Sequence, residues 1–545
     1  MQNILNLGKV DKILAISLIL GLVLCLYGIN WGRVEDWHPD QMAFIRLFYP
    51  GELPLNPKWF HKPPFHTYFN FFLSVLPFKI LEKLHISIDF IRPARLLWSR
   101  TLTVFLFMGS IVLVFVITKR FFGTFAARMV TVIFSTSAGP IAFSHFLTTD
   151  IPVMFWMLLA FYFAQNILLR GNYSDYILAG FLTGIATATK YNGLGVGIAI
   201  IAAHALSPSF DSFNQVFFSK KLFLGLFMVL VGFLVGNPFA LLDYSTFISD
   251  FMFNYLVTPV YFGNTGDSYL AFFERFSEII GWPAFLIFLL AFLFSFYVFF
   301  KCQEKSNDRR ALLLILSVLL LYYYKFGSFP RLPTRFVLPI VPLWMIVSGP
   351  FWNIIKSNRI FVSIILVTLI SYNLVCDFYV GKRFVEDPRM AAQIWVKENI
   401  SNGSSIETTR FSPRWNNLPG VKLKNIIMPD INTRSNFFKQ HFKDNIWIVN
   451  HKSLQKKENT KWYTIEELIK RNPDYIAINY RYYNRFFETS GETNYPDIQR
   501  YFSNLLTEKY PYKIVFDRRS KAIPSWVYPQ EIDSIFNRMT IFSRK

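Results

Sequence analysis

The sequence predicts an α-helical polytopic membrane protein with a polar C-terminal domain. Of its 545 residues, 53% are hydrophobic and 19% are aromatic, and the mean hydropathy is +0.31, which is too apolar for an ordinary soluble protein. The apolar residues gather in runs close to the roughly 20 residues that a helix needs to cross a bilayer. From about Gly381 onward the chain is polar and free of cysteine. We therefore expect a membrane domain over residues 1–380 and a second domain over residues 381–545.

Two features of the composition exclude other classes of protein. The formal net charge is +21, but much of the Lys and Arg lies in short loops between apolar runs, as in the cytoplasmic loops of membrane proteins. The charge therefore predicts no nucleic-acid partner. The three cysteines, Cys25, Cys302 and Cys376, show no metal or disulfide spacing. The first apolar run has no small-residue cleavage site before Trp31 and Arg33, which predicts a retained helix and not a signal peptide.

The apolar runs give the expected order of membrane segments. They lie at 12–29, 65–81, 96–118, 126–147, 151–169, 176–190, 192–206, 221–240, 279–300, 311–327, 336–354 and 359–379. The short loops rich in Lys and Arg should face the cytoplasm, and they lie at 119–128, 170, 220–221, 301–310 and 356–359. With the N-terminus and these basic loops all in the cytoplasm, the segment 65–81 cannot cross the membrane completely. We therefore expect that segment to lie along the membrane surface or to re-enter. About eleven spans and an exported C-terminus follow.

The first exported loop, expected within residues 30–95, holds a dense group of polar side chains. The stretch 31–66 contains Glu35, Asp36, His38, Asp40, Arg46, Glu52, His61, Lys62 and His66 between Trp and Phe residues. Such groups beside a membrane span are costly to keep unless they bind something. Asp40 follows His38-Pro39 and lies between two aromatic-rich segments, and we predict a functional role for it.

Other polar residues at the ends of apolar runs fall on the same predicted side. This exported set is Asp40, His61, Lys62, Asp150, Lys190, Asp243, Arg331 and Arg335. Folding of the helices could bring the set to one cavity. Each residue also has an ordinary interpretation, because an Asp at a helix start usually caps the helix and a Lys or Arg at a helix end usually reaches lipid head groups.

The polar C-terminal part predicts a small α/β domain on the exported side. Short alternating runs at 447–449 and 475–478 are typical of strands, and helical patterns at 390–399 and 465–471 lie between and beside them.

Several short motifs, taken in order, resemble one family of membrane enzymes. They are His38-Pro39-Asp40-Gln41, His61-Lys62-Pro63-Pro64, Leu147-Thr148-Thr149-Asp150, Thr189-Lys190-Tyr191, Asn237-Pro238-Phe239, Arg335-Phe336-Val337-Leu338-Pro339 and Asp387-Pro388-Arg389 with Trp395. The chain resembles the GT-C class of glycosyltransferases that use lipid-linked sugars, in particular the protein O-mannosyltransferase and aminoarabinose transferase (ArnT-like) group. The likeness covers essentially the whole chain. Many relatives carry Glu where this chain has Gln41 and His61.

The resemblance implies a GT-C fold and an activity. It implies transfer of a sugar from a polyprenyl-phosphate-linked donor to an acceptor hydroxyl on the exported side, with inversion at the anomeric carbon. Asp40 would be the general base, with Asp150 as a second catalytic residue. Growing negative charge on the leaving phosphate calls for cations, and the resemblance and the sidedness together point to Lys62, Lys190, Arg331 and Arg335. Contacts to donor or acceptor would come from His38, His61, Tyr191 and Asp243.

Several points stay open on the sequence alone. The sugar is not readable, and a glycan, a lipid or a protein would each fit as the acceptor. The sequence identifies no particular cofactor and leaves a divalent metal open, because His38, Asp40, His61 and His66 form a mixed nitrogen and oxygen set that would suit zinc or manganese. A transporter or lipid flippase is the alternative function, and it should show an inverted repeat and mid-span charges. We expect a multi-pass protein among membrane lipids, in a bacterial inner membrane.

Overall fold

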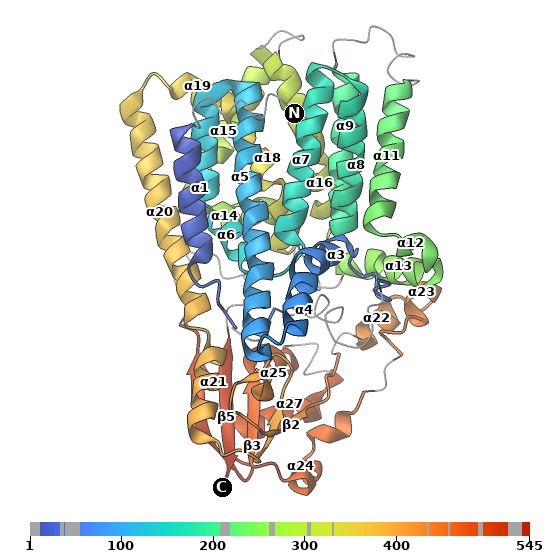
Figure 1. The fold of residues 1–545 in the computed structure, drawn as a ribbon, viewed down its shortest axis with the longest axis vertical. Helices are drawn as coiled ribbons and strands as arrows, with labels where there is room; N and C mark the ends of the chain where they lie inside the picture. The colour runs from blue at the N-terminus through green and yellow to red at the C-terminus, as the bar shows by residue number, and fades with distance from the viewer. Residues whose placement is uncertain are drawn as a thin grey trace.

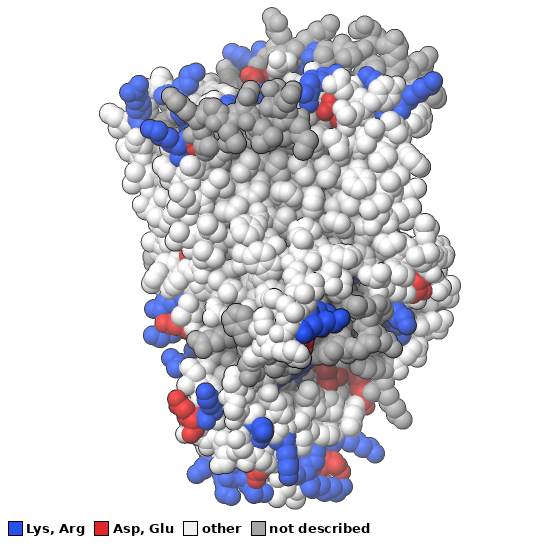
Figure 2. All heavy atoms as spheres, in the orientation of Figure 1, with Lys and Arg blue, Asp and Glu red and all other residues white. Residues whose placement is uncertain are grey.

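The computed structural model describes residues 11–32, 37–38, 55–207, 219–260, 268–301, 307–329, 332–432, 435–455, 458–488, 494–521 and 537–545. Two regions stack along the long axis of the molecule (Figure 1). A bundle of helices forms one region, and a sheet with its own short helices lies at one end of the bundle. On the face shown, the space-filling view has a broad, mostly uncharged band across the bundle, with Lys and Arg gathered beyond it at both ends (Figure 2). That distribution suits a bundle that crosses a bilayer.

Six described segments are long and apolar enough to cross a membrane. They are Pro93–Ser135, Asp150–Leu169, Trp282–Lys301, Asn307–Gly327, Thr334–Ile355 and Arg359–Asn399, and two shorter apolar segments are Lys12–Leu26 and Tyr191–Ala205. A helix of 20 residues such as Asp150–Leu169 is about 30 Å long, which matches the apolar thickness of a bilayer. The chain is therefore an integral membrane protein. The expected count of about eleven spans stays a prediction.

The helical elements of the bundle follow the predicted runs closely. They are α1 (Lys12–Leu26), α5 (Ile88–Ser135), α6 (Ala138–Ser144), α7 (Asp150–Leu169), α8 (Tyr173–Thr189), η3 (Tyr191–Gly197), α9 (Ile198–Ala205), α11 (Lys220–Gly236), α15 (Trp282–Lys301), α16 (Asn307–Gly327), α17 (Thr334–Val337), η4 (Leu338–Ile340), α18 (Val341–Ile346), α19 (Gly349–Ile355) and α20 (Arg359–Val385). Within α5, Gly123 has a non-helical backbone (φ 84°, ψ 174°), which only glycine adopts readily. It breaks the helix inside the basic loop predicted at 119–128.

Residues 65–83 are helical but are not among the candidate spans. They form α3 (Phe65–Asn70), a π-helical turn η2 (Phe71–Val75) and α4 (Leu76–Lys83). In Figure 1 this segment lies at the end of the bundle that faces the sheet. The expectation that 65–81 lies at a membrane surface is consistent with this position.

The predicted exported loop between 237 and 278 contains helices that the apolar runs did not reveal. They are α12 (Phe239–Leu242), α13 (Tyr244–Val260) and α14 (Ser268–Ile280). Polar residues such as Asp243 and Asp250 interrupt the apolar pattern there, so the stretch reads as a loop. In Figure 1, α12 and α13 lie at the same end of the bundle as α3.

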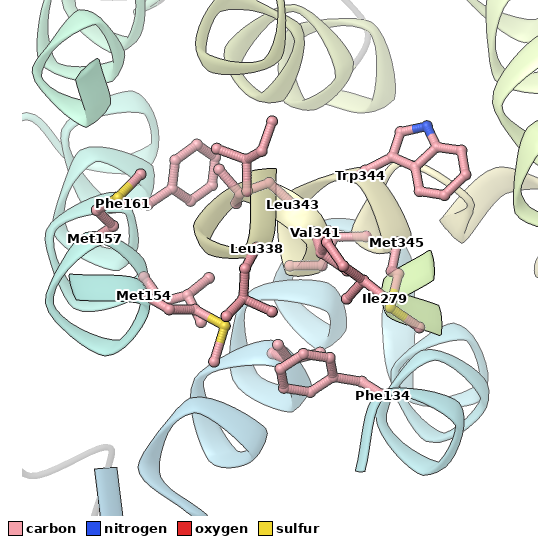
Figure 3. Packing of buried hydrophobic residues seen from close by; sticks show 14 of the residues in the cluster. Phe134, Met154, Met157, Phe161, Ile279, Leu338, Val341, Leu343, Trp344 and Met345 are labelled. Atoms are coloured by element: carbon pink, nitrogen blue, oxygen red, sulfur yellow. The ribbon is translucent and has the colours of Figure 1, made fainter. Parts of the chain in front are cut away.

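The centre of the bundle is a tightly packed apolar core (Figure 3). All six residues of α18 are buried, and the Trp344 ring centroid lies 4.2 Å from that of Phe276 on α14. Met154 and Phe161 of α7 belong to the same cluster. Lipid is as apolar as these side chains, so close packing, and not exclusion from water, holds such helices together.

Glycines allow two pairs of helices to approach closely. A Cβ on Gly184 of α8 would lie 2.3 Å from the Val229 oxygen of α11, and one on Gly232 of α11 would lie 2.1 Å from the Phe181 oxygen. The first and last helices of the bundle meet in the same way. A Cβ on Gly381 of α20 would lie 2.0 Å from the Tyr27 ring. Side chains at these positions would push the helices apart.

The C-terminal residues form a five-stranded mixed sheet. Its strands are β1 (Ser405–Thr408), β2 (Lys424–Ile427), β3 (Tyr475–Asn479), β4 (Tyr512–Arg519) and β5 (Arg538–Arg544), in the order β2-β1-β3-β5-β4. Strands β2, β1 and β3 are parallel, and β5 is antiparallel to both β3 and β4. The helical elements around it are α21 (Pro388–Asn399), η5 (Trp415–Asn417), α22 (Ser435–His441), α23 (Ile446–Val449), η6 (Thr460–Tyr463), α24 (Ile465–Arg471), α25 (Tyr480–Tyr483), η7 (Asn484–Phe486) and α27 (Pro496–Leu506).

Two details of this region differ from the sequence-based expectations. The run 447–449, interpreted as a strand, lies in the one-turn helix α23, whose N-cap Asn445 accepts a hydrogen bond from the Trp447 amide. Helix α20 continues to Val385, past the expected boundary at 381. The expected strand at 475–478 is part of β3.

The orientation across the membrane can be tested by labelling single cysteines. In a Cys302→Ser background, in which Cys25 and Cys376 are buried, we place cysteine at exposed Asn402 near the sheet or at exposed Arg359 at the start of α20. An impermeant maleimide applied to intact cells should label Asn402→Cys and should label Arg359→Cys only after lysis. Labelling of both from the same side contradicts the topology.

Candidate functional site

A buried ion pair joins the ends of two membrane helices. Asp150 is the first residue of α7, and Lys190 follows the last residue of α8, where the backbone becomes extended (φ −156°, ψ 131°). Lys190 Nζ lies 2.8 Å from Asp150 Oδ1, and these side chains are 15% and 4% exposed. The helix cap residue is Thr149, so the Asp150 carboxylate pairs with a cation instead of capping the helix.

Arg335 completes this group from a third part of the chain. It lies on the short helix α17, and its carbonyl oxygen accepts a longer hydrogen bond (3.4 Å) from Lys190 Nζ. The charge of Arg335 also acts on Asp150. The next residue, Phe336, places its ring centroid 5.0 Å from Lys190 Nζ. Three motifs that are far apart in the sequence thus meet, and they bring two cations and one carboxylate together.

The loop that carries His61 and Lys62 is held against the helices by main-chain contacts. The Tyr191 hydroxyl donates a 2.7 Å hydrogen bond to the Phe60 oxygen, and the Phe60 amide donates one of 2.7 Å to Asp250 Oδ2. These bonds anchor the chain at Phe60, two residues before the half-buried Lys62. Tyr191, predicted as a substrate contact, has its hydroxyl engaged by the protein.

Asp243 has a similar anchoring contact. Asn56 Nδ2 donates a 2.8 Å hydrogen bond to Asp243 Oδ2, which links the loop before Phe60 to the junction of α12 and α13. Hydrogen bonds from Asn56 and Thr246 hold the pKa of Asp243 below its usual range. Its carboxylate is therefore charged and bound to the protein itself.

A second cluster joins the same loop to the C-terminal region. His451 Nε2 lies 3.0 Å from Asp250 Oδ1, and His61 Nε2 lies 3.9 Å from the same oxygen. Burial lowers the pKa of His61 to about 4, against the opposing charge of Asp250. Burial would raise the pKa of Asp250, but hydrogen bonds from His451 and the Phe60 amide hold it below the usual range. At neutral pH, His61 is therefore neutral beside a charged carboxylate.

The chemistry of this trio suits a divalent cation. Among the residues that the structure describes, His61, Asp250 and His451 offer three ligand atoms that all lie within 4.8 Å of one another. Two imidazole nitrogens and one carboxylate oxygen match a zinc site with one open position. Lys452 Nζ lies 3.2 Å from Asp250 Oδ1, and it would have to give way to the cation.

The other predicted site residues have separate environments. The His38 ring packs at a tilt against Phe146, with ring centroids 4.5 Å apart. The His66 Nε2 atom lies 3.0 Å from Asn70 Nδ2, one turn further along the helix. Asp40 and Arg331 lie outside the described residues. Of the metal candidates His38, Asp40, His61 and His66, the structure brings His61 to a group of potential ligands.

Sequence reasoning did not find Asp250 and His451. Asp250 had a local signal, because it is the one charged residue of α13. His451 had no such signal, since its contact joins residues 201 positions apart across two regions. Only the fold brings them together.

Comparison with known proteins agrees with this architecture. Residues 96–236 match the family model described as dolichyl-phosphate-mannose-protein mannosyltransferase. ArnT from Cupriavidus metallidurans, solved with undecaprenyl phosphate bound, superposes with a TM-score of 0.51 over 97% of each chain, at 12% identity. The chain has the fold of the GT-C glycosyltransferases of the ArnT and protein O-mannosyltransferase type. The family resemblance drawn from the short motifs is thus confirmed.

Two further solved GT-C structures give lower scores. The Archaeoglobus fulgidus oligosaccharyltransferase, solved with Zn and sulfate, has a TM-score of 0.46 at 11% identity and covers 95% of this chain and 74% of its own. The S. cerevisiae Pmt1–Pmt2 O-mannosyltransferase complex, solved with its sugar donor, has a TM-score of 0.31 at 18% identity over 44% and 35%. No curated protein sequence matches the chain.

Zinc binding by the His61–Asp250–His451 trio can be measured without any knowledge of the substrate. Zinc at about 100 times its dissociation constant would stabilise the folded protein by about 2.7 kcal/mol, so it should raise the unfolding temperature of the purified, metal-stripped protein. His451→Ala should abolish the shift, and His441→Ala, at an exposed position on α22, should keep it. An equal shift in both variants excludes the trio.

Proposed function

We propose that the protein is a glycosyltransferase that moves a sugar from a polyprenyl-phosphate-linked donor to an acceptor hydroxyl. The observation that carries the proposal is the group of Asp150, Lys190 and Arg335. It lies where α7 and α8 meet, and it presents two cations and one carboxylate in a fold of the ArnT type. Fixed cations of these two kinds suit a phosphate group.

The cations match what the reaction needs. As the bond between sugar and phosphate breaks, negative charge grows on the polyprenyl phosphate, and fixed positive charges lower the barrier when they already face it. The ArnT structure with undecaprenyl phosphate bound supports a donor of this kind. Lys190 and Arg335 are the proposed phosphate ligands, and Lys62 and Arg331 are further candidates for the same role. A lysine supplies a point charge, whereas an arginine can grip two phosphate oxygens at once.

Asp150 has a different proposed task from Asp40. Because Asp150 is buried and bound to Lys190, we assign it the role of holding that ammonium group in place. Asp40, two residues after His38, is the proposed general base that takes the proton from the acceptor hydroxyl during an inverting attack. The histidines His38 and His61 and the residues Tyr191 and Asp243 then shape and anchor the loop around the site.

The proposed setting follows from the sidedness of the chain. In Figure 1, α3, α12, α13 and α23 lie at the end of the bundle that faces the sheet, and we propose that this end faces away from the cytoplasm, as the basic loops predict. We assign the protein to a bacterial inner membrane, with a glycan, a lipid or a protein as acceptor. A transporter or flippase is not favoured, because the charged groups gather at a helix end and not at mid-span.

One experiment tests the function and names the substrates. The gene is deleted in the source organism, and the envelope glycans, glycolipids and glycoproteins are compared by mass spectrometry. Loss of one sugar mass from one acceptor, restored by the wild-type gene, is the expected result. An unchanged envelope under conditions in which the gene is expressed contradicts the proposal.

The role of Asp40 predicts a loss of turnover without a loss of donor binding. Asp40→Asn keeps the shape of the side chain but cannot accept the acceptor proton, and a general base contributes about 10²- to 10⁴-fold. We expect a loss of that size in the restored sugar, with undecaprenyl phosphate binding retained. Asp497→Asn, at a side chain that is 82% exposed, is the control. Full activity of Asp40→Asn removes Asp40 from the base role.

The role of Lys190 can be separated from its effect on folding. Lys190→Ala alone leaves Asp150 buried without its partner, which typically costs about 3–5 kcal/mol, so reduced yield is expected. The double variant Lys190→Met with Asp150→Asn removes both charges at similar volume and should restore yield, yet bind undecaprenyl phosphate weakly. Lys356→Ala, an exposed cation at the start of the loop before α20, should bind normally. Normal binding by the double variant contradicts the assignment.

A further inference from the structure

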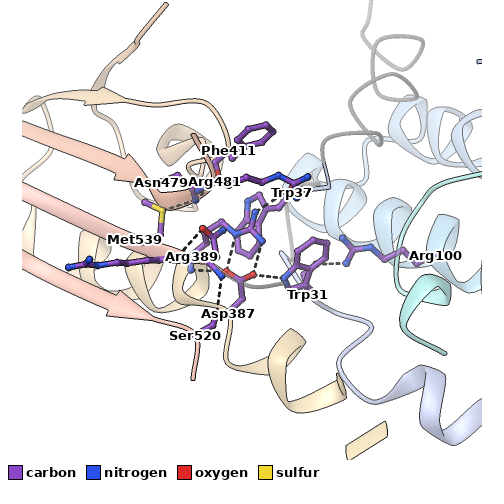
Figure 4. A network of polar contacts seen from close by, with 12 residues as sticks. Trp31, Trp37, Arg100, Asp387, Arg389, Phe411, Asn479, Arg481, Ser520 and Met539 are labelled. Carbon is purple, nitrogen blue, oxygen red and sulfur yellow. Dashed lines mark hydrogen bonds and ion pairs between the residues drawn. The ribbon is translucent and has the colours of Figure 1, made fainter. Parts of the chain in front are cut away.

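A buried polar cluster ties the beginning of the first exported loop to the C-terminal region (Figure 4). Trp31, just after α1, is 1% exposed, and Trp37 is 3% exposed. The Trp31 Nε1 group donates a 2.9 Å hydrogen bond to Oδ2 of Asp387, 356 residues further along the chain. Asp387 is also the N-cap of α21 and accepts from the Arg389 amide at 2.8 Å. One carboxylate thus begins the helix that leads to the sheet and holds the loop.

Arg389 holds the second tryptophan of the loop. Its Nε and a terminal nitrogen grip both Asp387 oxygens at 2.9 and 2.7 Å. The other terminal nitrogen donates to the Trp37 carbonyl oxygen at 3.4 Å. The guanidinium carbon lies 4.6 Å from the Trp37 ring centroid and 5.2 Å from that of Trp31. A planar, bidentate and stacked cation of this kind is a role that lysine fills poorly.

Arg100 holds the same loop from the membrane side. It lies on α5, is 1% exposed, and donates to the carbonyl oxygens of Ile29 and Trp31. Its guanidinium carbon lies 5.3 Å from the Trp31 ring centroid. Trp31 also packs edge-on against Phe384 of α20, with centroids 5.4 Å apart.

The kind of contact indicates what the cluster does. Both arginines direct hydrogen bonds to main-chain carbonyls of the loop, at residues 29, 31 and 37. They therefore fix the path of the backbone, in addition to packing on the two indole rings. Two arginines and one aspartate are costly to bury, and packing alone could be achieved with apolar residues. Asp40 follows Trp37 by three residues, which span at most about 11 Å.

We infer that Arg100, Asp387 and Arg389 are positioning residues for the catalytic loop. We call this group of three residues the loop clamp. The inference rests on the proposed function, since it assigns the loop clamp to the placement of Asp40. The loop clamp holds the chain at Trp31 and Trp37, from which residues 38–40 continue. A shift of about 1 Å in a reacting group can cost about 100-fold in rate, so a rigid base for this loop matters for turnover more than for donor binding.

The test compares two arginines that each bind a carboxylate through two nitrogens and lie over a tryptophan ring. Arg389→Lys keeps the charge and loses the fork in the loop clamp. Arg471→Lys makes the same change within the C-terminal region, where Arg471 grips Glu407 at 2.6 and 3.2 Å and lies 3.9 Å from the Trp462 ring centroid. Each variant is expressed in the deletion strain at matched level, and the restored sugar is quantified. Binding of undecaprenyl phosphate and the unfolding temperature are measured on the purified protein.

We expect Arg389→Lys to lower the restored sugar about 10- to 100-fold and to leave undecaprenyl phosphate binding within about twofold of wild type. Arg471→Lys should keep both. Equal losses of sugar in the two variants would mean that the loop clamp contributes only to the general stability of the protein, and would overturn the inference. A parallel loss of binding in Arg389→Lys, or wild-type sugar levels, overturns the inference.

A milder variant covers the case in which Arg389→Lys does not accumulate. Trp31→Phe removes the indole N–H donated to Asp387 and keeps an aromatic ring. It should lower the restored sugar about threefold or more at unchanged undecaprenyl phosphate binding, and wild-type sugar levels overturn the inference. The proposed function fails in a different way, because then the wild-type gene itself would restore no sugar.

Discussion

The structure depends on an ion pair buried at a junction of membrane helices. Asp150 and Lys190 lie at helix ends that the chain reaches forty residues apart, and each would be costly to bury without the other. Their contact fixes how α7 meets α8, and Arg335 can join them only when α17 packs alongside. The same contact that stabilises the bundle holds the Lys190 ammonium group in place, so one arrangement serves both folding and the proposed recognition of phosphate.

The second constraint is that residues of both the helix bundle and the C-terminal region hold the proposed catalytic loop. The loop clamp holds its beginning, and the Asp250 and His451 contact holds the part around Phe60 and His61. Both anchors use residues beyond 385. The C-terminal region therefore supplies partners for the loop at positions that precede and follow Asp40 in the sequence.

The sequence predicts the bundle well because apolar runs of spanning length have few alternatives to a helix in lipid. Loop charge and the motifs predicted that Asp150, Lys190 and Arg335 share one side of the membrane, but they did not predict the ion pair between Asp150 and Lys190. Helices α13 and α14 were missed because polar residues interrupt their apolar pattern. The prediction of a strand at 447–449 was wrong, since a local cap at Asn445 favours a helical turn. His451 could not be predicted from the sequence because its partner, Asp250, lies 201 residues away.

The contact between Gly28 and Gly381 has a consequence for synthesis. Helices α1 and α20 are the first and last of the bundle, and they touch at these glycines, with the loop clamp just beyond. At about 5–20 residues per second, the ribosome needs roughly 20–70 s to pass from one to the other. During that interval the first helix waits in the membrane without its final neighbour, and the loop after it lacks the anchor that Asp387 and Arg389 supply.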